Sequence, residues 1–208
     1  MGAVTPLDPV LVVFGYLLGG VPTGLLLVRA VKGIDIRQYG SGNIGTANVV
    51  RVAGPWAGAA VFIADFLKGL LPVLLARQLT GLPLAAALTG LAAVCGHCWP
   101  VWLGFRGGRG VATGVGALAA VAPLFALAGI LTWVLVVAAT RYASAGSMAG
   151  LLVAVGLFTG STLAGNYPPP YLLMVLGGAA VVIWRHRENI GRLLRGEERR
   201  LGPPGTGP

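Results

Sequence analysis

Long apolar runs without a charged side chain restrict the folds open to this chain more than any other feature. Residues 9–28 form a run of 20 residues of this kind, and residues 111–140 form one of 30. A helix of about 20 apolar residues crosses the hydrocarbon core of a bilayer, and only helices and closed barrels satisfy their backbone hydrogen bonds there. With 56% hydrophobic and 10% charged residues, the chain is predicted to be an all-α integral membrane protein.

Residues 1–200 are predicted to form one polytopic membrane domain of about seven transmembrane helices. Further apolar runs predict spans near residues 53–76, 84–103, 145–163 and 170–184. Residues 111–140 would be about 45 Å long as one helix, against a hydrocarbon core of about 30 Å. We therefore expect Pro123 to divide this run into two short spans or a re-entrant hairpin. Residues 201–208, rich in Pro and Gly, are predicted to be a disordered end.

The basic residues predict which side of the membrane each loop faces. With seven passes, all but two of the 15 Lys and Arg residues, Lys68 and Arg77, would lie on the same side or at its border. Cytoplasmic loops carry an excess of Lys and Arg, so the N-terminus is predicted outside and the C-terminus in the cytoplasm. No basic segment precedes the first apolar run, which is long enough to span, so we expect no cleaved signal peptide.

A net charge of +9 could instead indicate a nucleic-acid-binding protein. The basic residues lie between apolar spans rather than on one soluble face, so we expect no nucleic-acid partner. Two charges, Asp65 and Lys68, fall inside a predicted span. They lie three residues apart on one helical face, where each can offset the desolvation cost of the other. A structural ion pair and a supporting role behind a functional site are both open interpretations.

The first polar cluster on the predicted cytoplasmic face is a glycine-rich turn. It contains Gly40, Ser41, Gly42, Asn43, Gly45 and Thr46. Its amides and side-chain donors can surround an oxyanion, and Asn43 can also cap a helix that ends near Arg51. A turn without any ligand is the simpler interpretation of this pattern.

The second cluster lies within residues 95–113, CGHCWPVWLGFRGGRGVAT. Gly107, Gly108 and Arg109 stand directly before a predicted helix that begins near Val111. Unpaired amides at a helix N-terminus bind anions, glycine lets the backbone approach a phosphate closely, and arginine supplies planar paired donors. This stretch is therefore a candidate phosphate site.

Two further clusters are predicted on the same face. Residues 141–147, RYASAGS, place Ser144 and Ser147 beside an arginine, and the simpler interpretation there is a helix N-cap. In the last cluster, His186, Asn189 and Arg192 share one helical face, and a polybasic tail at an anionic membrane is the simpler alternative. Taken together, the four clusters predict a pocket for one or two phosphate groups.

Cys95 and Cys98 have the spacing of a dithiol oxidoreductase site. They lie in an apolar span without a soluble α/β domain and without a second cysteine pair, so a redox function is not expected. The whole chain has two cysteines and two histidines, too few for an ordinary zinc site. We therefore predict neither a metal nor a cofactor.

The motifs resemble those of the bacterial acyl-phosphate:glycerol-3-phosphate acyltransferase family over nearly the whole chain. The matching segments, in order, are GSGNIGTANVVRVAG, ADFLKG, GHCWPVWLGFRGGRGVAT, RYASAGS and HRENIGRLLRGEE. The chain departs from the family pattern at Thr46 and Ala47, where Ala-Thr is usual, which removes a hydroxyl from position 47 or moves it to position 46. It also carries Arg106 and Arg109 where lysines are usual, which keeps the charge but changes the donor geometry.

The resemblance implies transfer of a fatty acyl group from acyl phosphate to the 1-hydroxyl of sn-glycerol 3-phosphate, giving lysophosphatidic acid and phosphate, the first step of phospholipid synthesis. It also implies a seven-span fold in the bacterial cell (inner) membrane, with the active site facing the cytoplasm and no metal. The expected partners are the two substrates, the bilayer and the enzyme that supplies acyl phosphate, and a monomer is expected.

The site residues are predicted from the clusters and the resemblance together. The predicted catalytic residues are Ser41, Asn43, Arg51, Arg109, His186 and Asn189. The predicted substrate-binding residues are Gly40, Gly42, Gly45, Thr46, Gly107, Gly108, Ser144, Ser147 and Arg192.

The chemistry of these residues favours positioning and charge stabilisation. A His followed five residues later by Asp, as in other glycerolipid acyltransferases, is absent, because Trp102 and Gly191 occupy the corresponding positions. A substrate phosphate oxygen or His186 would then take the proton of the glycerol hydroxyl. Two other classes of protein remain as alternatives: a transporter or channel for an organic phosphate, and a scaffolding subunit. A transporter would need polar residues at mid-membrane, where only Asp65 and Lys68 are predicted.

Overall fold

The computed structural model describes residues 6–202, whose regular structure consists of ten α-helices and two 3-10 helices. The elements are α1 (Leu7–Gly19), α2 (Thr23–Lys32), η1 (Ile36–Gln38), α3 (Thr46–Ala53), α4 (Pro55–Thr80), α5 (Pro83–Cys98), η2 (Val101–Leu103), α6 (Val111–Ala119), α7 (Pro123–Thr140), α8 (Ala143–Leu163), α9 (Tyr171–Arg185) and α10 (Arg187–Leu194). The predicted all-α class is confirmed.

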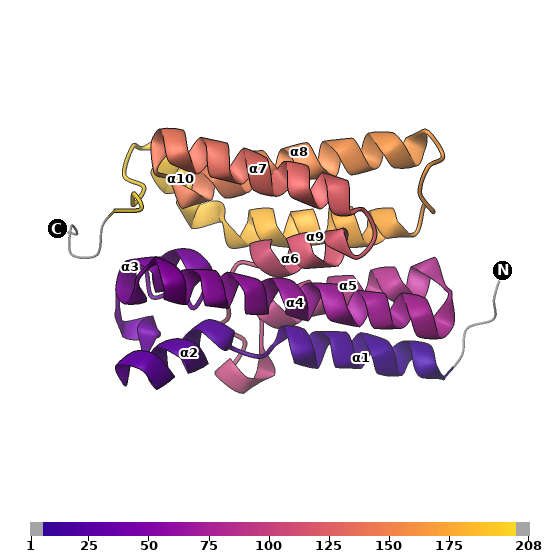
Figure 1. Cartoon of the computed structure of the whole chain (residues 1–208), viewed down its shortest axis with the longest axis horizontal. Helices are drawn as coiled ribbons and strands as arrows, with labels where there is room; N and C mark the ends of the chain where they lie inside the picture. The colour runs from indigo at the N-terminus through magenta and orange to yellow at the C-terminus, as the bar shows by residue number, and fades with distance from the viewer. Residues whose placement is uncertain (1–5, 203–208) are drawn as a thin grey trace.

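The long helices lie side by side and form an elongated bundle (Figure 1). α1, α4 and α5 make up one side, α7, α8 and α9 make up the other, and the short α6 lies between them. α1 begins at one end of the bundle, whereas α3, α10 and the C-terminal segment lie at the other, which we call the α3/α10 end. The first and last described residues therefore lie at opposite ends, as an odd number of passes requires.

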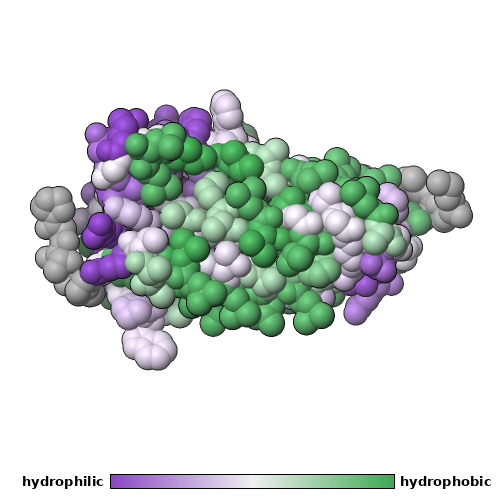
Figure 2. All heavy atoms as spheres, turned by 90° about the horizontal axis from the view of Figure 1, so that it is seen from above, coloured by the Kyte–Doolittle hydropathy of each residue, from purple (hydrophilic) through white to green (hydrophobic). Residues whose placement is uncertain are grey.

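Helix length supports a membrane protein and leaves the number of passes open. Five segments of the described chain are long and apolar enough to cross a bilayer, and α9, with 15 residues, is shorter. Figure 2 shows apolar side chains over the middle of the molecule and hydrophilic ones gathered mainly toward the α3/α10 end. An apolar band of this kind between polar ends is the surface that a bilayer requires.

The first predicted span is interrupted at residues 20–22, between α1 and α2. Pro22 has no N–H for a helical hydrogen bond, and the carbonyl of Val21 is released from the helix. Lys68 donates to this carbonyl at 2.7 Å, pairs with Asp65 at 2.9 Å, and Asp65 in turn accepts from the hydroxyl of Thr23. The ion pair, one of the two interpretations left open by the sequence, is present, and Lys68 also satisfies the carbonyl at the break between α1 and α2.

Pro123 divides the run of 30 uncharged residues, as predicted, and begins α7. α6 before it has nine residues, so it extends about 13 Å and cannot cross a core of about 30 Å. The guanidinium of Arg77 donates to the carbonyl of Ala120 in the turn between the two helices. α6 is therefore too short to be a span of its own, whereas α7, with 18 residues, is long enough to cross a bilayer.

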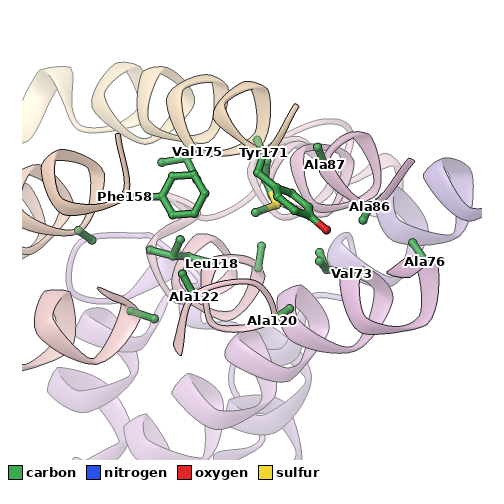
Figure 3. Close-up of a cluster of buried hydrophobic side chains, with 14 of the residues drawn as sticks. Val73, Ala76, Ala86, Ala87, Leu118, Ala120, Ala122, Phe158, Tyr171 and Val175 are labelled. Atoms are coloured by element: carbon green, nitrogen blue, oxygen red, sulfur yellow. The ribbon is translucent and has the colours of Figure 1, made fainter. Parts of the chain in front are cut away.

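Small residues and an apolar cluster hold α6 in place. A Cβ on Gly69 of α4 would lie 2.0 Å from the carbonyl oxygen of Thr113, and one on Gly116 would lie 2.0 Å from that of Phe66. Such contacts let two helices approach closely in a membrane. Val73, Leu118, Phe158 and Val175, from four different helices, belong to the apolar cluster at the other end of α6 (Figure 3). The start of α6 is thereby fixed relative to the rest of the bundle.

Candidate active site

One cavity of about 440 Å³ opens between α4, α6, α7, α8 and α9 and extends to the glycine-rich turn before α3. Eight of the predicted site residues line it: Ser41, Asn43, Gly45, Thr46, Arg109, Ser144, Ser147 and His186. Its remaining wall is mostly apolar and includes Val115, Ile130, Trp133, Leu151, Val155 and Met174. The cavity therefore joins a polar mouth at the α3/α10 end to an apolar interior within the bundle.

The glycine-rich turn is organised by a residue that the sequence analysis did not select, Asn48. Its buried carboxamide accepts from the amide of Ser41 at 2.8 Å and donates to the carbonyls of Tyr39 and Asn43 at 3.0 and 2.9 Å. Gly40 has φ +59°, and a Cβ there would lie 2.2 Å from Oδ1 of Asn48. The turn is thus shaped around an internal carboxamide, which leaves the side chains of Ser41 and Asn43 at the cavity.

Asn43 does not cap the helix that follows it, contrary to one interpretation of the sequence. α3 begins at Thr46 with Gly45 as its N-cap, and Oδ1 of Asn43 accepts from the amide of Gly45 at 2.8 Å. An Asx turn of this kind fixes the chain just before the helix, because the side-chain oxygen bonds two residues ahead. The side chain of Asn43 therefore serves the turn and also borders the cavity.

The second glycine loop is held by its backbone. The amides of Gly107 and Gly108 donate to the carbonyls of Cys98 and His97 at 3.1 and 3.0 Å, so these two amides are not free for an anion. A Cβ on Gly108 would lie 2.0 Å from Nε2 of His97, which explains the need for glycine there. What this loop offers the cavity is the side chain of Arg109 and the start of α6.

A carboxylate not selected from the sequence, Glu198, joins three of the predicted site residues. Its Oε1 accepts from the hydroxyl of Ser144 at 2.8 Å and from the amide of Asn189 at 2.6 Å, while Nε of Arg192 donates to Oε2 at 2.9 Å. Burial raises the pKa of Glu198, but these hydrogen bonds outweigh it and leave the pKa below its ordinary value. Asn189 and Arg192 reach this carboxylate and do not line the cavity.

The segment that carries Glu198 crosses the α3/α10 end and ties separate loops together. Arg51 donates to the carbonyl of Arg199 at 3.1 Å, and Arg199 donates to the carbonyl of Gly40 at 3.1 Å. Farther on, Leu201 exchanges hydrogen bonds with Arg141 at 2.7 and 2.8 Å. Leu201 is thus held in place and borders the cavity, whereas most of the tail predicted to be disordered, residues 203–208, lies outside the described residues.

Two guanidinium groups give the mouth of the cavity its charge. Burial, with a smaller effect of neighbouring arginines, lowers the pKa of Arg109 to about 10 and also lowers the pKa of Arg51. Arg109 still carries its charge at neutral pH. Within residues 6–202, Nε of Arg51 is a buried donor without a hydrogen-bond partner. Both groups are therefore able to bind an anion.

His186 lies at the junction of α9 and α10 and borders the cavity. Burial and, to a smaller extent, the nearby Arg109 lower its pKa to about 4, so the ring is neutral at pH 7. Nδ1 lies 2.8 Å from the carbonyl of Val182, which can only accept a hydrogen bond, so in the neutral ring the proton sits on Nδ1. Nε2 is then a free acceptor.

A sequence model described as glycerol-3-phosphate acyltransferase matches residues 9–196 of this chain. The chain belongs to this family. Glycerol-3-phosphate acyltransferases from Rubrobacter xylanophilus and an Anaeromyxobacter species are 51% and 48% identical to it. The alignments cover 94% of the chain and 96% of the first relative, and 95% of the chain and 98% of the second.

Two crystal structures are similar to the whole fold. Both are of PlsY, described as an integral membrane glycerol 3-phosphate acyltransferase, one in a glycerol 3-phosphate form and one in a lysophosphatidic acid form. The first has a TM-score of 0.86 at 44% identity and covers 94% of this chain and 96% of its own; the second has a TM-score of 0.85 at 43% identity and covers 94% and 95%. The chain is therefore an integral membrane enzyme of the glycerol-3-phosphate acyltransferase family.

Within this acyltransferase, the predicted site residues separate into two groups. Eight line the cavity, as described above. The others do not line it: Gly40, Gly42, Arg51, Gly107, Gly108, Asn189 and Arg192. Of these, Gly42 and Gly107 border a second pocket of about 500 Å³. Asn48 and Glu198 both lie inside the matched motifs, and their polar side chains there were the signals that the sequence offered.

Proposed function

We propose that this acyltransferase moves a fatty acyl group from acyl phosphate to the 1-hydroxyl of sn-glycerol 3-phosphate, giving lysophosphatidic acid and phosphate. The observation that carries the proposal is the cavity of about 440 Å³ with a polar, arginine-bearing mouth and an apolar interior. Such a cavity fits a phosphorylated head group joined to a fatty chain. The two forms of the similar PlsY structures, with glycerol 3-phosphate and with lysophosphatidic acid, agree with this choice of acceptor and product.

Two phosphate groups have to be held side by side at the mouth of the cavity. Arg109 faces the cavity directly, and Arg51 supplies a buried donor without a partner close to the anchored tail. Ser41, Ser144 and Ser147 add hydroxyl groups along the same rim. We assign these residues to the substrate phosphates, because paired guanidinium and hydroxyl donors suit phosphate oxygens. The hydroxyls of Ser144 and Ser147 donate to Glu198 and to the carbonyl of Ala143 in this structure, so each would have to rotate to donate to a phosphate.

The proposed reaction needs little chemistry from the protein. The 1-hydroxyl oxygen attacks the acyl carbon, the bond from that carbon to the phosphate oxygen breaks, and phosphate leaves with the electron pair. Since phosphate is a good leaving group, stabilisation of the developing charge by Arg109 and correct alignment supply most of the acceleration. The hydroxyl proton passes to Nε2 of His186 or to a substrate phosphate oxygen.

The donor is tested with purified protein and labelled glycerol 3-phosphate. One of three donors is supplied in parallel reactions: acyl phosphate, acyl-CoA, or an acyl carrier protein thioester. We expect labelled lysophosphatidic acid with acyl phosphate alone. Product formed from a thioester and not from acyl phosphate would contradict the proposal.

We further propose that the α3/α10 end faces the cytoplasm of a bacterial inner membrane and that the enzyme acts as a monomer beside the enzyme that supplies acyl phosphate. Most basic residues lie at this end, in agreement with the positive-inside rule. Cysteines introduced at Asn166 and Arg195, both exposed and at opposite ends, test the orientation in intact cells. An impermeant thiol reagent should label the cysteine at position 166 and not the one at position 195. The opposite labelling pattern would show that the topology is the reverse of the proposed one.

A further inference from the structure

Arg109 lies in a loop that has no regular secondary structure and few side chains to anchor it. Residues 106–110 form no helix and no strand, and three of them are glycines. Gly107 and Gly108 have no side chains to anchor, and a Cβ at either position would lie within 2.2 Å of an atom of His97. The backbone groups of these two glycines are therefore the only groups by which they can be held.

One edge of the loop is attached to the end of α5. The amides of Gly107 and Gly108 donate to the carbonyls of Cys98 and His97, as described above. His97 itself is buried, and its ring lies 3.8 Å from the carboxylate of Asp65. These bonds fix where the two glycines lie but leave their carbonyls, which precede Arg109, to be held by another group.

Arg185, the last residue of α9, holds both carbonyls. Its Nη2 donates to the carbonyl oxygen of Gly107 at 2.8 Å, and its Nε donates to that of Gly108 at 3.0 Å. The guanidinium also lies 5.7 Å from the centre of the Trp99 ring, which restrains it from a second side. A planar fork with two parallel donors can bridge two adjacent carbonyls, and a lysine ammonium group cannot do so in the same geometry.

We propose that Arg185 is a positioning residue of the acyltransferase, which sets the orientation of Arg109 by donating hydrogen bonds to the carbonyl groups of Gly107 and Gly108. Arg185 does not line the cavity of about 440 Å³, but its side chain borders a second pocket of about 500 Å³ beside Gly42 and Gly107. The carbonyl of Gly108 belongs to the peptide that enters Arg109, so rotation of that peptide redirects the guanidinium. This inference rests on the proposed function of Arg109 as a phosphate ligand.

The same helix end also presents His186 to the cavity. Arg185 and His186 are consecutive, with one bound to the glycine loop and the other bordering the cavity. The end of α9 therefore sets two elements of the site relative to each other. An error of about 1 Å in such alignment can lower the rate about 100-fold.

Kinetics of Arg185→Lys and Arg185→Met test the proposal, with Arg187→Lys and Arg187→Met as matched controls. Arg187 is an exposed arginine two residues away whose guanidinium stacks on Trp184. We expect Arg185→Met to lower kcat/KM for glycerol 3-phosphate about 10- to 100-fold and Arg185→Lys to restore it only in part. Both Arg187 variants should stay within about twofold of wild type.

A double-variant experiment separates positioning from general damage. If Arg185 acts through Arg109, adding Arg185→Met to Arg109→Gln should lower kcat/KM by less than about threefold further. The proposal would be overturned if the fold-losses of Arg185→Met and Arg109→Gln multiply in the double variant. It would also be overturned if Arg185→Met and Arg185→Lys both have the kcat/KM of wild type. If Arg185→Met does not fold, Arg185→Lys alone and combined with Arg109→Gln gives the same comparison.

Failure of the proposed donor would be visible separately. The assay first establishes which acyl donor the wild-type enzyme uses, and the Arg185 variants are then measured with that donor. A wild type that uses a thioester would refute the proposed function, whereas the comparison of Arg185 with Arg187 would remain decisive for positioning.

Discussion

Arg106 and Arg109 lie three residues apart and face different surroundings. Arg106 is exposed, whereas Arg109 is partly buried and lines the cavity. Replacing each by Gln removes the same charge from the same loop. We expect Arg109→Gln to lower kcat/KM about 100-fold or more, as loss of one donor to a developing negative charge does, and Arg106→Gln to change it less than about threefold. Steady-state kinetics with both substrates measures this, and equal losses in the two variants would refute the role of Arg109.

The titration of His186 offers a second test at the scale of single residues. Its pKa is lowered to about 4 by burial and by Arg109, so a His186 base stays active down to about that pH and is lost below it. A substrate phosphate acting as the base would instead give an inflection near pH 6, where phosphate monoesters titrate. Single-turnover rates of wild type and His186→Ala from pH 4 to 8 distinguish the two. A modest loss in His186→Ala with unchanged pH dependence would exclude His186 as the base.

Among the elements of the site, the turn before α3 depends most clearly on its glycines. Gly33 and Gly40 both have positive φ, +68° and +59°, but only Gly40 would bring a Cβ against Asn48, and Gly33 has open space around it. Gly33→Ala should therefore cost about 1 kcal/mol, for the left-handed backbone alone. Gly40→Ala should cost about 2 kcal/mol more, because it displaces the carboxamide that holds Ser41 and Asn43.

Thermal unfolding in detergent and the KM for both substrates check this difference. Only Gly40→Ala should raise a KM, since the turn near Gly33 does not border the cavity. Equal midpoints and equal KM values for the two variants would show that Asn48 does not organise the turn.

At the scale of the whole molecule, the tail joins parts of the chain that are far apart in sequence. Glu198 binds α8 and α10, and the residues after it bind the turn before α3 and Arg141 at the end of α7. Glu198→Gln should lower the free energy of unfolding by about 1–3 kcal/mol, because a charged acceptor of three hydrogen bonds is lost. Glu197→Gln is the matched control, since that exposed carboxylate pairs with the exposed Arg195, and it should change stability by less than about 0.5 kcal/mol.

The pH dependence of stability follows from the same carboxylate. Because the pKa of Glu198 is lowered in the folded protein from an ordinary value of 4.5, its contribution is complete above pH 4.5 and is lost as the pH falls through the folded pKa. The unfolding midpoint of wild type should therefore fall more between pH 6 and pH 3 than that of Glu198→Gln. Parallel curves for the two proteins would show that Glu198 is not a stabilising anion.

The sequence by itself determined that this is a helical membrane protein, that Pro123 divides its longest apolar run, and that Asp65 and Lys68 share one helical face. These features follow from local rules, namely the length of apolar runs, the missing N–H of proline and helical spacing, so no tertiary information was needed. The family could also be identified from motifs that lie in order along the chain.

Only the tertiary structure decided which polar groups face the cavity and which support it. Asn189, Arg192 and Ser144 all form hydrogen bonds with Glu198. Arg185 forms hydrogen bonds with a loop more than 70 residues away in the sequence, because α9 packs against α5. Likewise, the amides of Gly107 and Gly108 are taken by carbonyls at the end of α5. A hydrogen-bond partner is chosen by proximity in space, and spacing along the sequence does not contain that information.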